Sequence, residues 1–188
     1  MSDDRSPARL ESDWAAVGRL AAAGGPRGSI QRTLLHIGDE HAVVLSGQGD
    51  KPERVQQVAL GAARIARDFF HHDPPSSREI ERAIDFVEDE LMRLGKPAEV
   101  VTTLWSTSPT LQAWSEVAGP TMPIETVEQW FQLLASASLG QPGGMRGLPS
   151  GREAAATLLV LREFMHHRGH ASIFLVDAPD AVPHQPQR

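Results

Sequence analysis

The sequence contains no cysteine. Disulfide-stabilised scaffolds, zinc sites with thiolate ligands and cysteine nucleophiles are therefore excluded, and a reducing compartment is compatible with the chain. The sequence also lacks a Gly-x-Ser-x-Gly pentapeptide, the usual signature of a serine nucleophile in α/β hydrolases. Few options for covalent nucleophilic catalysis remain.

Long apolar runs and an excess of positive charge are missing as well. The longest apolar run, residues 154–161, is interrupted by Thr157 and is far too short to span a bilayer. Residues 1–9 are polar and no continuous apolar stretch follows them, so we recognise no secretory signal peptide. The formal net charge is −6, and nucleic acids and anionic membranes attract proteins of the opposite sign. We expect a cytoplasmic protein with neither nucleic acid nor membrane as a partner.

The features that are present are those of a globular α/β domain. The chain has 188 residues, of which 40% are hydrophobic, and this length can bury a substantial core. Strand patterns alternate with helical patterns, which predicts layers of helices on a sheet. We expect one domain over residues 1–178 and a disordered tail over residues 179–188, where three prolines lie.

Hydrophobic periodicity and Gly, Pro and Ser positions place the individual elements. Ser76 and Glu79 form a capping box before one amphipathic helix, and Ser150 and Glu153 have the same spacing before another. Helices are predicted over residues 6–23, 62–71, 76–94, 109–117, 123–138 and 150–168. Strands are predicted as a hairpin over residues 31–46 and singly over residues 55–60, 99–104 and 172–176.

The hairpin is the most informative stretch, with the sequence TLLHIGDEHAVVLS over residues 33–46. Val, Ile and Leu favour strands on both sides of Gly38-Asp39. Gly38 tolerates the positive φ that a type II′ turn requires at its first position, so we predict a two-residue loop. This register pairs Ile37 with Glu40 and places His36 opposite His41. The tip then carries carboxylates and imidazoles, and the candidate catalytic residues are His36, Asp39, Glu40 and His41.

Two other clusters have simpler interpretations. His166 and His170 are four residues apart, the spacing of two metal ligands on a helix, but Gly169 lies between them and favours a helix end. We interpret these histidines, and those at residues 71–72, as solvated helix ends without metal. The acidic residues Asp85, Glu88, Asp89 and Glu90 lie between Arg82 and Arg93 on a helix with an apolar stripe on its other side, so we interpret them as a solvated helix face.

The glycine- and proline-rich stretch 140–151 lacks the Gly-Lys-Ser/Thr ending of a nucleotide P-loop. Its junction with the next helix, Ser150-Gly151-Arg152, could still hold an anion at the helix start, with Arg152 well placed for that role. The simpler alternative, an ordinary capped helix, is the one we favour.

Read together, these segments resemble the second actin-like half of the exopolyphosphatase / guanosine pentaphosphate phosphohydrolase (Ppx/GppA) family. Where the family has Asp-Ile-Gly-Gly-Gly-Ser-Thr-Glu, this chain has HIGDEHAV over residues 36–43. VALG over residues 58–61, DPPS over residues 73–76, WST over residues 105–107 and GLPSGR over residues 147–152 resemble later family segments in the same order. The resemblance spans residues 8–178 and depends on the order and spacing of all the segments.

The resemblance implies a single actin-like, ribonuclease H-like domain with a mixed sheet of about five strands flanked by helices. It also implies phosphate-ligand binding at Gly38, Thr107 and Arg152. Family members cleave terminal phosphoanhydrides with Mg²⁺ and a general-base Glu, in a cleft between two actin-like domains. Residues 6–10, SPARL, stand where the family has Glu-Ala-Arg-Leu, so we expect both the base and the first domain to be missing.

The hairpin also departs from the family pattern electrostatically. Of three family glycines only Gly38 remains, and Asp39 and Glu40 add negative charge where a polyanion would bind. Two like charges ~4 Å apart repel by about 4 kcal/mol at an effective dielectric constant near 20. Mg²⁺ or protonated histidines would offset part of this repulsion.

Three hypotheses follow. The first is a degenerate Ppx/GppA-like domain without phosphatase activity that binds a protein partner, a second copy of itself or a phosphate-containing ligand. The second is a metal-dependent phosphoanhydride hydrolase with a site rebuilt from the hairpin residues, using Mg²⁺ as its cofactor. The third is a pH sensor based on His36 facing His41. No cofactor is certain, and no metal ligand is assigned.

Overall fold

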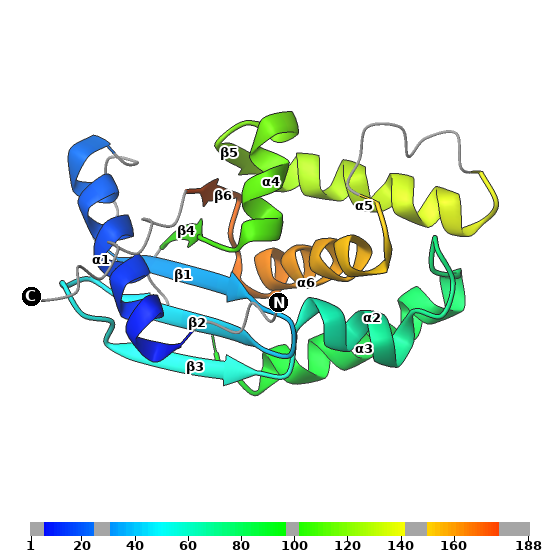
Figure 1. Cartoon of the computed structure of the whole chain (residues 1–188), viewed down its shortest axis with the longest axis horizontal. Helices are drawn as coiled ribbons and strands as arrows, with labels where there is room; N and C mark the ends of the chain where they lie inside the picture. Colours follow the sequence, from blue (N-terminus) through cyan, green and yellow to red (C-terminus); the bar gives the residue numbers. More distant parts are fainter. Residues whose placement is uncertain (1–5, 25–30, 97–101, 142–149, 177–188) are drawn as a thin grey trace, which may run out of the picture.

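A computed structural model describes residues 6–24, 31–96, 102–141 and 150–176. The fold is α/β, with a six-stranded mixed sheet in the order β3-β2-β1-β4-β6-β5 (Figure 1). The predicted fold class is confirmed, with one strand more than expected. The strands are β1 (Arg32–Ile37), β2 (Ala42–Gly47), β3 (Arg54–Val58), β4 (Thr103–Ser106), β5 (Thr121–Pro123) and β6 (Ser172–Leu175).

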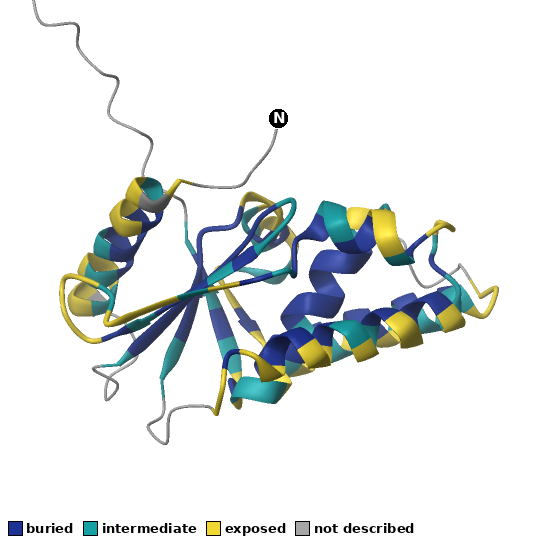
Figure 2. Ribbon diagram, turned by 90° about the horizontal axis from the view of Figure 1, so that it is seen from below, coloured by how far each residue is buried: buried dark blue, intermediate teal, exposed yellow. Residues whose placement is uncertain are grey.

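The helices cover both faces of this sheet unequally. They are α1 (Pro7–Gly24), α2 (Ala62–Phe69), α3 (Ser77–Met92), α4 (Pro109–Ala118), α5 (Ile124–Ser138) and α6 (Arg152–Arg168). Helix α1 packs alone on one face, where Trp14 meets Leu34 and Trp105 in a small apolar cluster. The other helices form the larger core on the opposite face, and α6 lies at its centre as a mostly buried helix (Figure 2). No helix within the described ranges is long and apolar enough to cross a membrane.

The sheet combines a parallel centre with antiparallel edges. Strands β1, β4 and β6 run parallel to one another, whereas β2, β3 and β5 are antiparallel to their neighbours. The carboxyl ends of parallel strands form one edge of a sheet, where ligands bind in many α/β folds. The hairpin tip after β1 and the residues after β4 therefore lie at the expected place for a functional site.

Two element predictions need correction. Strand β5 was not predicted, because a strand of three residues that follows Pro120 and ends with Pro123 has little of the periodicity that identifies longer strands. Pro is tolerated here because β5 is an edge strand. The capping box at the start of α3 is confirmed, with Glu79 Oε2 accepting the Ser76 amide at 2.7 Å. The one predicted for α6 is wrong, since Gly151 is the N-cap residue and no side chain caps that helix.

Parts of three other predictions lie outside the described residues. These are the start of the strand predicted over residues 99–104, most of the loop over residues 140–151, and the tail beyond residue 176.

Candidate functional site: the β1–β2 hairpin and its surroundings

The hairpin loop contains four residues rather than the predicted two. Ile37 pairs with Ala42 and His36 with Val43, and the Gly38 amide donates to the His41 carbonyl at 2.9 Å. Gly38 is not among the glycines with positive φ, so the predicted type II′ turn does not form. The predicted pairing of Ile37 with Glu40 is wrong for the same reason.

The longer loop also separates the two histidines. His36 is only 1% exposed and lies on the face of β1 that carries Leu34, toward the α1 cluster. His41 closes the loop and lines a pocket beside β3. The pair on which the pH-sensor hypothesis depends is therefore absent, and that hypothesis is overturned.

The hairpin tip is docked onto the first turn of α2. The Ala62 amide donates to the Gly38 carbonyl at 2.9 Å, and the Arg64 amide donates to the Asp39 carbonyl at 3.0 Å. The first amides of a helix have no partner within the helix and often bind anions. Here two of them are satisfied by the hairpin backbone, so this helix end is occupied by the protein itself.

Gly61 allows this close approach. A Cβ atom at residue 61 would lie 2.2 Å from the Asp39 carbonyl oxygen and 2.2 Å from the Glu40 carbonyl carbon. Such distances are far below van der Waals contact, and the atoms concerned are backbone atoms that cannot rotate away. The glycine that interrupts the predicted strand-to-helix region is therefore required for docking the loop.

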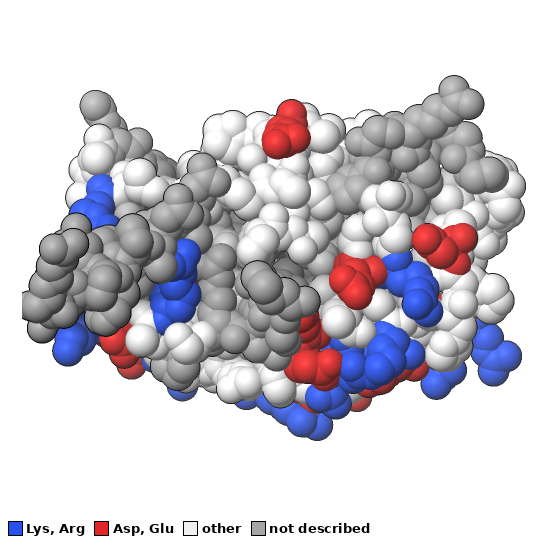
Figure 3. Space-filling model, in the orientation of Figure 1, with Lys and Arg blue, Asp and Glu red and all other residues white. Residues whose placement is uncertain are grey.

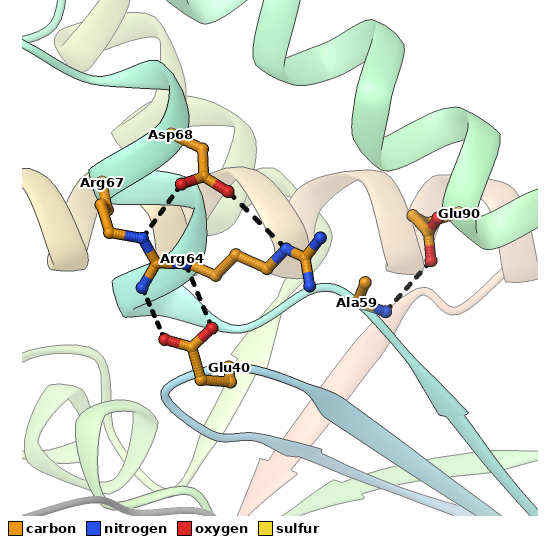
Figure 4. A network of polar contacts seen from close by, with 6 residues as sticks. All are labelled: Glu40, Ala59, Arg64, Arg67, Asp68 and Glu90. Carbon is orange, nitrogen blue, oxygen red and sulfur yellow. Dashed lines mark hydrogen bonds and ion pairs between the residues drawn. The ribbon is translucent and has the colours of Figure 1, made fainter.

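An ion-pair network joins the loop to the outer face of α2 (Figure 4). Arg67 donates from Nη1 to Glu40 Oε1 at 2.6 Å and from Nη2 to Oε2 at 3.1 Å. Asp68 accepts from Arg67 Nε at 3.0 Å, and its second oxygen lies 3.7 Å from Arg64 Nε. The hydrogen bonds from Arg67 hold the pKa of Glu40 below its ordinary value.

This network changes the chemistry expected of the hairpin. A carboxylate with a lowered pKa and both oxygens bound by a guanidinium is a weak general base. The charges of Glu40 and Asp68 are matched by Arg64 and Arg67, and acidic and basic side chains lie next to each other over α2 in the space-filling view (Figure 3). Sequence reasoning missed Arg67, whose only signal was its place on the exposed side of a helix.

The residues after β4 are tied into the interior. Ser106 Oγ donates to the Leu35 carbonyl at 2.7 Å, and the Ile37 amide donates to Ser108 Oγ at 2.7 Å. Thr107 Oγ1 donates to Asp13 Oδ2 at 2.9 Å, and both side chains are almost fully buried. The three hydroxyls therefore lock β4, β1 and α1 together. Ligand binding by Thr107 stays a prediction, and sequence reasoning missed Asp13.

Arg152 contacts the C-terminal end of α2, whereas the loop docks on its first turn. Arg152 Nη1 donates to the Phe70 carbonyl at 3.0 Å, at the end of α2. Arg152 and Arg67 line the same pocket, of about 420 Å³, together with Ser150, Gly151 and Glu153. Among the predicted site residues, Glu40 and Arg152 are thus connected through Arg67, whereas Thr107 faces Asp13 on α1.

The hairpin residues do not fit the magnesium ion that the family resemblance implies. Mg²⁺ takes oxygen ligands, usually one or two free carboxylates. Both oxygens of Glu40 are bound by Arg67, and the described part of the chain contains no group of three or more His, Asp or Glu side chains placed to hold a metal. His166 contacts Glu128, while His170 is buried against Phe164, so the interpretation of His170 as a solvated helix end is wrong.

The sheet order, the hairpin at the carboxyl edge and the buried helix α6 form an α/β fold of the actin-like type. No family model and no curated protein matches the sequence. The fold is similar to a Ppx/GppA phosphatase of Aquifex aeolicus in its type II variant, with 20% identity, a TM-score of 0.68, and coverage of 89% of this chain and 58% of that one.

An exopolyphosphatase from Cytophaga hutchinsonii is also similar, with 15% identity, a TM-score of 0.64, and coverage of 90% of this chain and 59% of that one. The chain thus spans a little under three fifths of the length of these structures. The resemblance to Ppx/GppA proteins predicted from the sequence is confirmed as a likeness of fold.

Proposed function

We propose that this chain is a binding domain with a Ppx/GppA-type fold, and that its β1–β2 hairpin serves to hold the structure together rather than to hydrolyse phosphoanhydrides. The observation that carries this proposal is the double hydrogen bond between Glu40 and Arg67. It occupies both oxygens of Glu40, one of the four candidate catalytic residues, and so leaves this carboxylate poorly suited to act as a base or a metal ligand.

The packing of the loop supports the same conclusion. A phosphate-binding loop works by presenting unpaired backbone amides at a distance that side chains would obstruct. In this chain the loop carbonyls accept the first amides of α2, and Gly61 presses against the loop backbone. An incoming phosphate would have to displace contacts made within the domain.

A protein is the partner class that we favour, as a second copy or a different chain, and a phosphate-containing ligand remains the alternative. The large apolar side chains that are well exposed in the described part of the chain do not cluster on one element. Four lie on four different elements and the fifth follows α5: Leu20, Val55, Met92, Val117 and Leu139. Recognition through charge and backbone groups is therefore better supported than recognition through one large apolar surface.

The test is phosphate release by the purified full chain from inorganic polyphosphate and from guanosine pentaphosphate, with Mg²⁺ and then Mn²⁺. We expect the wild type, Glu40→Gln and His41→Asn to give the same background. Glu11→Gln, an exposed change on α1, is the matched control. Release by the wild type that Glu40→Gln or His41→Asn abolishes and Glu11→Gln retains would establish the hydrolase instead.

A further inference from the structure

Strand β3 forms an open edge of the sheet. It is the last strand in the order and pairs only with β2 among the described strands. Arg54, Val55 and Gln57 are exposed, and the strand lies nearest the viewer when the molecule is seen from below (Figure 2). Beyond its end, Glu90 Oε2 accepts the Ala59 amide at 3.0 Å. A side chain thus closes the edge after β3, while no strand among the described residues pairs with the outer side of its first four residues.

Basic side chains gather on one side of this edge. Gln56 Nε2 donates to the Leu94 carbonyl at 3.2 Å, and Arg168 Nη1 donates to the Gly95 carbonyl at 2.7 Å. The ends of α3 and α6 therefore meet beside β3. Arg54 points to the same side as Gln56, because alternate residues of a strand share a face.

The positive charges there are poorly balanced. The basic edge consists of Arg54, Arg93 and Arg168, together with Lys96, which directly follows Gly95 in the chain. Within the described ranges, Arg93 pairs with Glu90 at 2.8 Å, and no carboxylate forms an ion pair with the other three. Burial first, and then the nearby charge of Arg54, lower the pKa of Arg168. Positive side chains thus lie together beside one strand, although the net charge of the chain is −6.

A pocket runs along the same strand. It has a volume of about 430 Å³, and its lining combines the apolar Val58 and Leu94 with the polar Gln56 and His41 and with the ion pair of Glu90 and Arg93. In strand addition, main-chain hydrogen bonds give affinity and pockets for alternate side chains give selectivity. The edge of β3 offers both, together with a positive field.

We propose that β3 binds an extended acidic segment of a partner protein by strand addition. The segment pairs its backbone with residues 54–57, its Asp or Glu side chains lie against the basic edge, and an apolar side chain enters the pocket at Val58 and Leu94. This inference rests on the proposed function, since it names the partner of a binding domain. It locates the binding surface away from the hairpin loop.

Charge decides between this occupant and the alternatives. Charged side chains on an edge strand oppose pairing between two identical edges, so a second copy of β3 would bring the same cations together. A nucleic acid or a polyphosphate would use the cations, but neither would use the strand backbone or the apolar pocket. An acidic peptide uses all three features.

The experiment measures binding of short fluorescent peptides to the full chain by anisotropy, with amide hydrogen exchange as a second readout. The probe is an extended peptide that carries several Glu and then one Val at alternate positions, which share a face, with Thr at the positions between them. Its matched control replaces each Glu with Lys. We expect the acidic peptide to bind, the basic peptide not to bind, and amides of residues 54–57 to become protected. A peptide N-methylated on alternate residues, made in both registers, should lose binding in one register, because methylation removes the donors that a strand needs.

A second experiment uses variants of the chain. One variant carries both Arg54→Glu and Lys96→Glu, and its control carries Arg78→Glu, an exposed change at the start of α3. We expect the double variant to weaken acidic-peptide binding about tenfold and Arg78→Glu to leave it unchanged. If the double variant fails to fold, the N-methylated peptides still decide the question, because they use the wild-type chain.

Four results would overturn the inference: no binding of the acidic peptide, equal binding of the basic peptide, full tolerance of N-methylation in both registers, or equal loss with Arg78→Glu. Polyphosphate or single-stranded nucleic acid that binds through Arg54 and Lys96 while the peptide does not would overturn it as well. Phosphate release by the hairpin would contradict the proposed function alone, whereas failed peptide binding would contradict only this inference.

Discussion

The hairpin loop and the edge of β3 are two charged regions of the same molecule, and they differ in how many of their charged and backbone groups have partners within the domain. At the loop, each carboxylate of the network faces a guanidinium, and the backbone carbonyls accept the amides of α2. At the β3 edge, only Arg93 of the four cations forms an ion pair among the described residues, and the strand has no neighbour there on its outer side. Polar and charged groups that are paired within a domain stabilise its fold, whereas groups without such a partner are available to bind another molecule.

The comparison also reverses the expectation from sequence. The loop looked functional because glycine, acidic residues and histidines meet there, and it matched the family's phosphate segment. The edge of β3 showed no motif at all. Acidic residues and histidines in a sequence indicate a functional site only when their side chains are not already paired with other groups of the same domain.

Gly61→Ala is the most damaging single change for the loop. The added Cβ would lie 2.2 Å from backbone atoms of Asp39 and Glu40, so the loop must move away from α2 and lose its hydrogen bonds to that helix. We expect a loss of roughly 3 kcal/mol or more in the free energy of unfolding, measured by urea denaturation. The ion pair of Glu40 with Arg67 should be disrupted with it.

Gly49→Ala is the matched control for this change. A Cβ at residue 49 would have Lys51 O as its nearest neighbour, at 4.0 Å, so we expect a change within about 0.5 kcal/mol. Equal stability of the two variants would mean that the loop is not pressed against α2, and the contrast between the two regions would disappear.

The second prediction concerns His170, which follows α6 and lies close to the basic edge. Burial lowers the pKa of His170 to about 4, and the charge of Arg168 acts in the same direction. A hydrogen bond with the Thr102 backbone opposes part of this decrease. The unfolded chain therefore binds this proton more tightly than the folded chain. Stability should be unaffected above pH 6.5 and should fall by about 3 kcal/mol as the pH drops from 6.5 to 4.

The measurement is the free energy of unfolding from pH 7.5 to pH 4.5, compared between the wild type and His170→Gln. The variant should be less stable at neutral pH, because it loses the stacking of the imidazole on Phe164, but its stability should decline less in this window. Parallel pH profiles of the two proteins would show that His170 is not kept neutral by the fold.

Much of the fold could be predicted because it follows from local pattern. The apolar stripe and the capping box of α3 identify that helix from its own residues. Gly169 adopts a left-handed conformation at the end of α6, as its position suggested. The order of strands and helices carried the likeness to Ppx/GppA structures, although sequence identity with them is only 15–20%.

The site was harder to predict because it depends on contacts between distant residues. Arg67 is 27 positions from Glu40, and Thr107 is 94 positions from Asp13. The length of the hairpin loop was also decided at a distance, since Gly61 and Arg64 hold the loop backbone in its four-residue form. No local preference of Gly38 or Asp39 reports those neighbours, so a two-residue turn was the natural local prediction.

The smallest expected effect belongs to the ion pair itself. Glu40→Gln removes the charge that Arg67 binds while keeping the shape of the side chain, and both partners are well exposed to water. Exposed ion pairs contribute little to stability and are screened by salt. We therefore expect a small decrease of Tm at low ionic strength that vanishes in 1 M NaCl.

Glu81→Gln, on the outer face of α3, is the control and should show no such salt dependence. A decrease of Tm that persists in high salt would mean that Glu40 acts through packing of the loop rather than through its charge. An increase of Tm would mean that the Glu40 carboxylate destabilises the loop, which is expected of a functional group rather than a structural one.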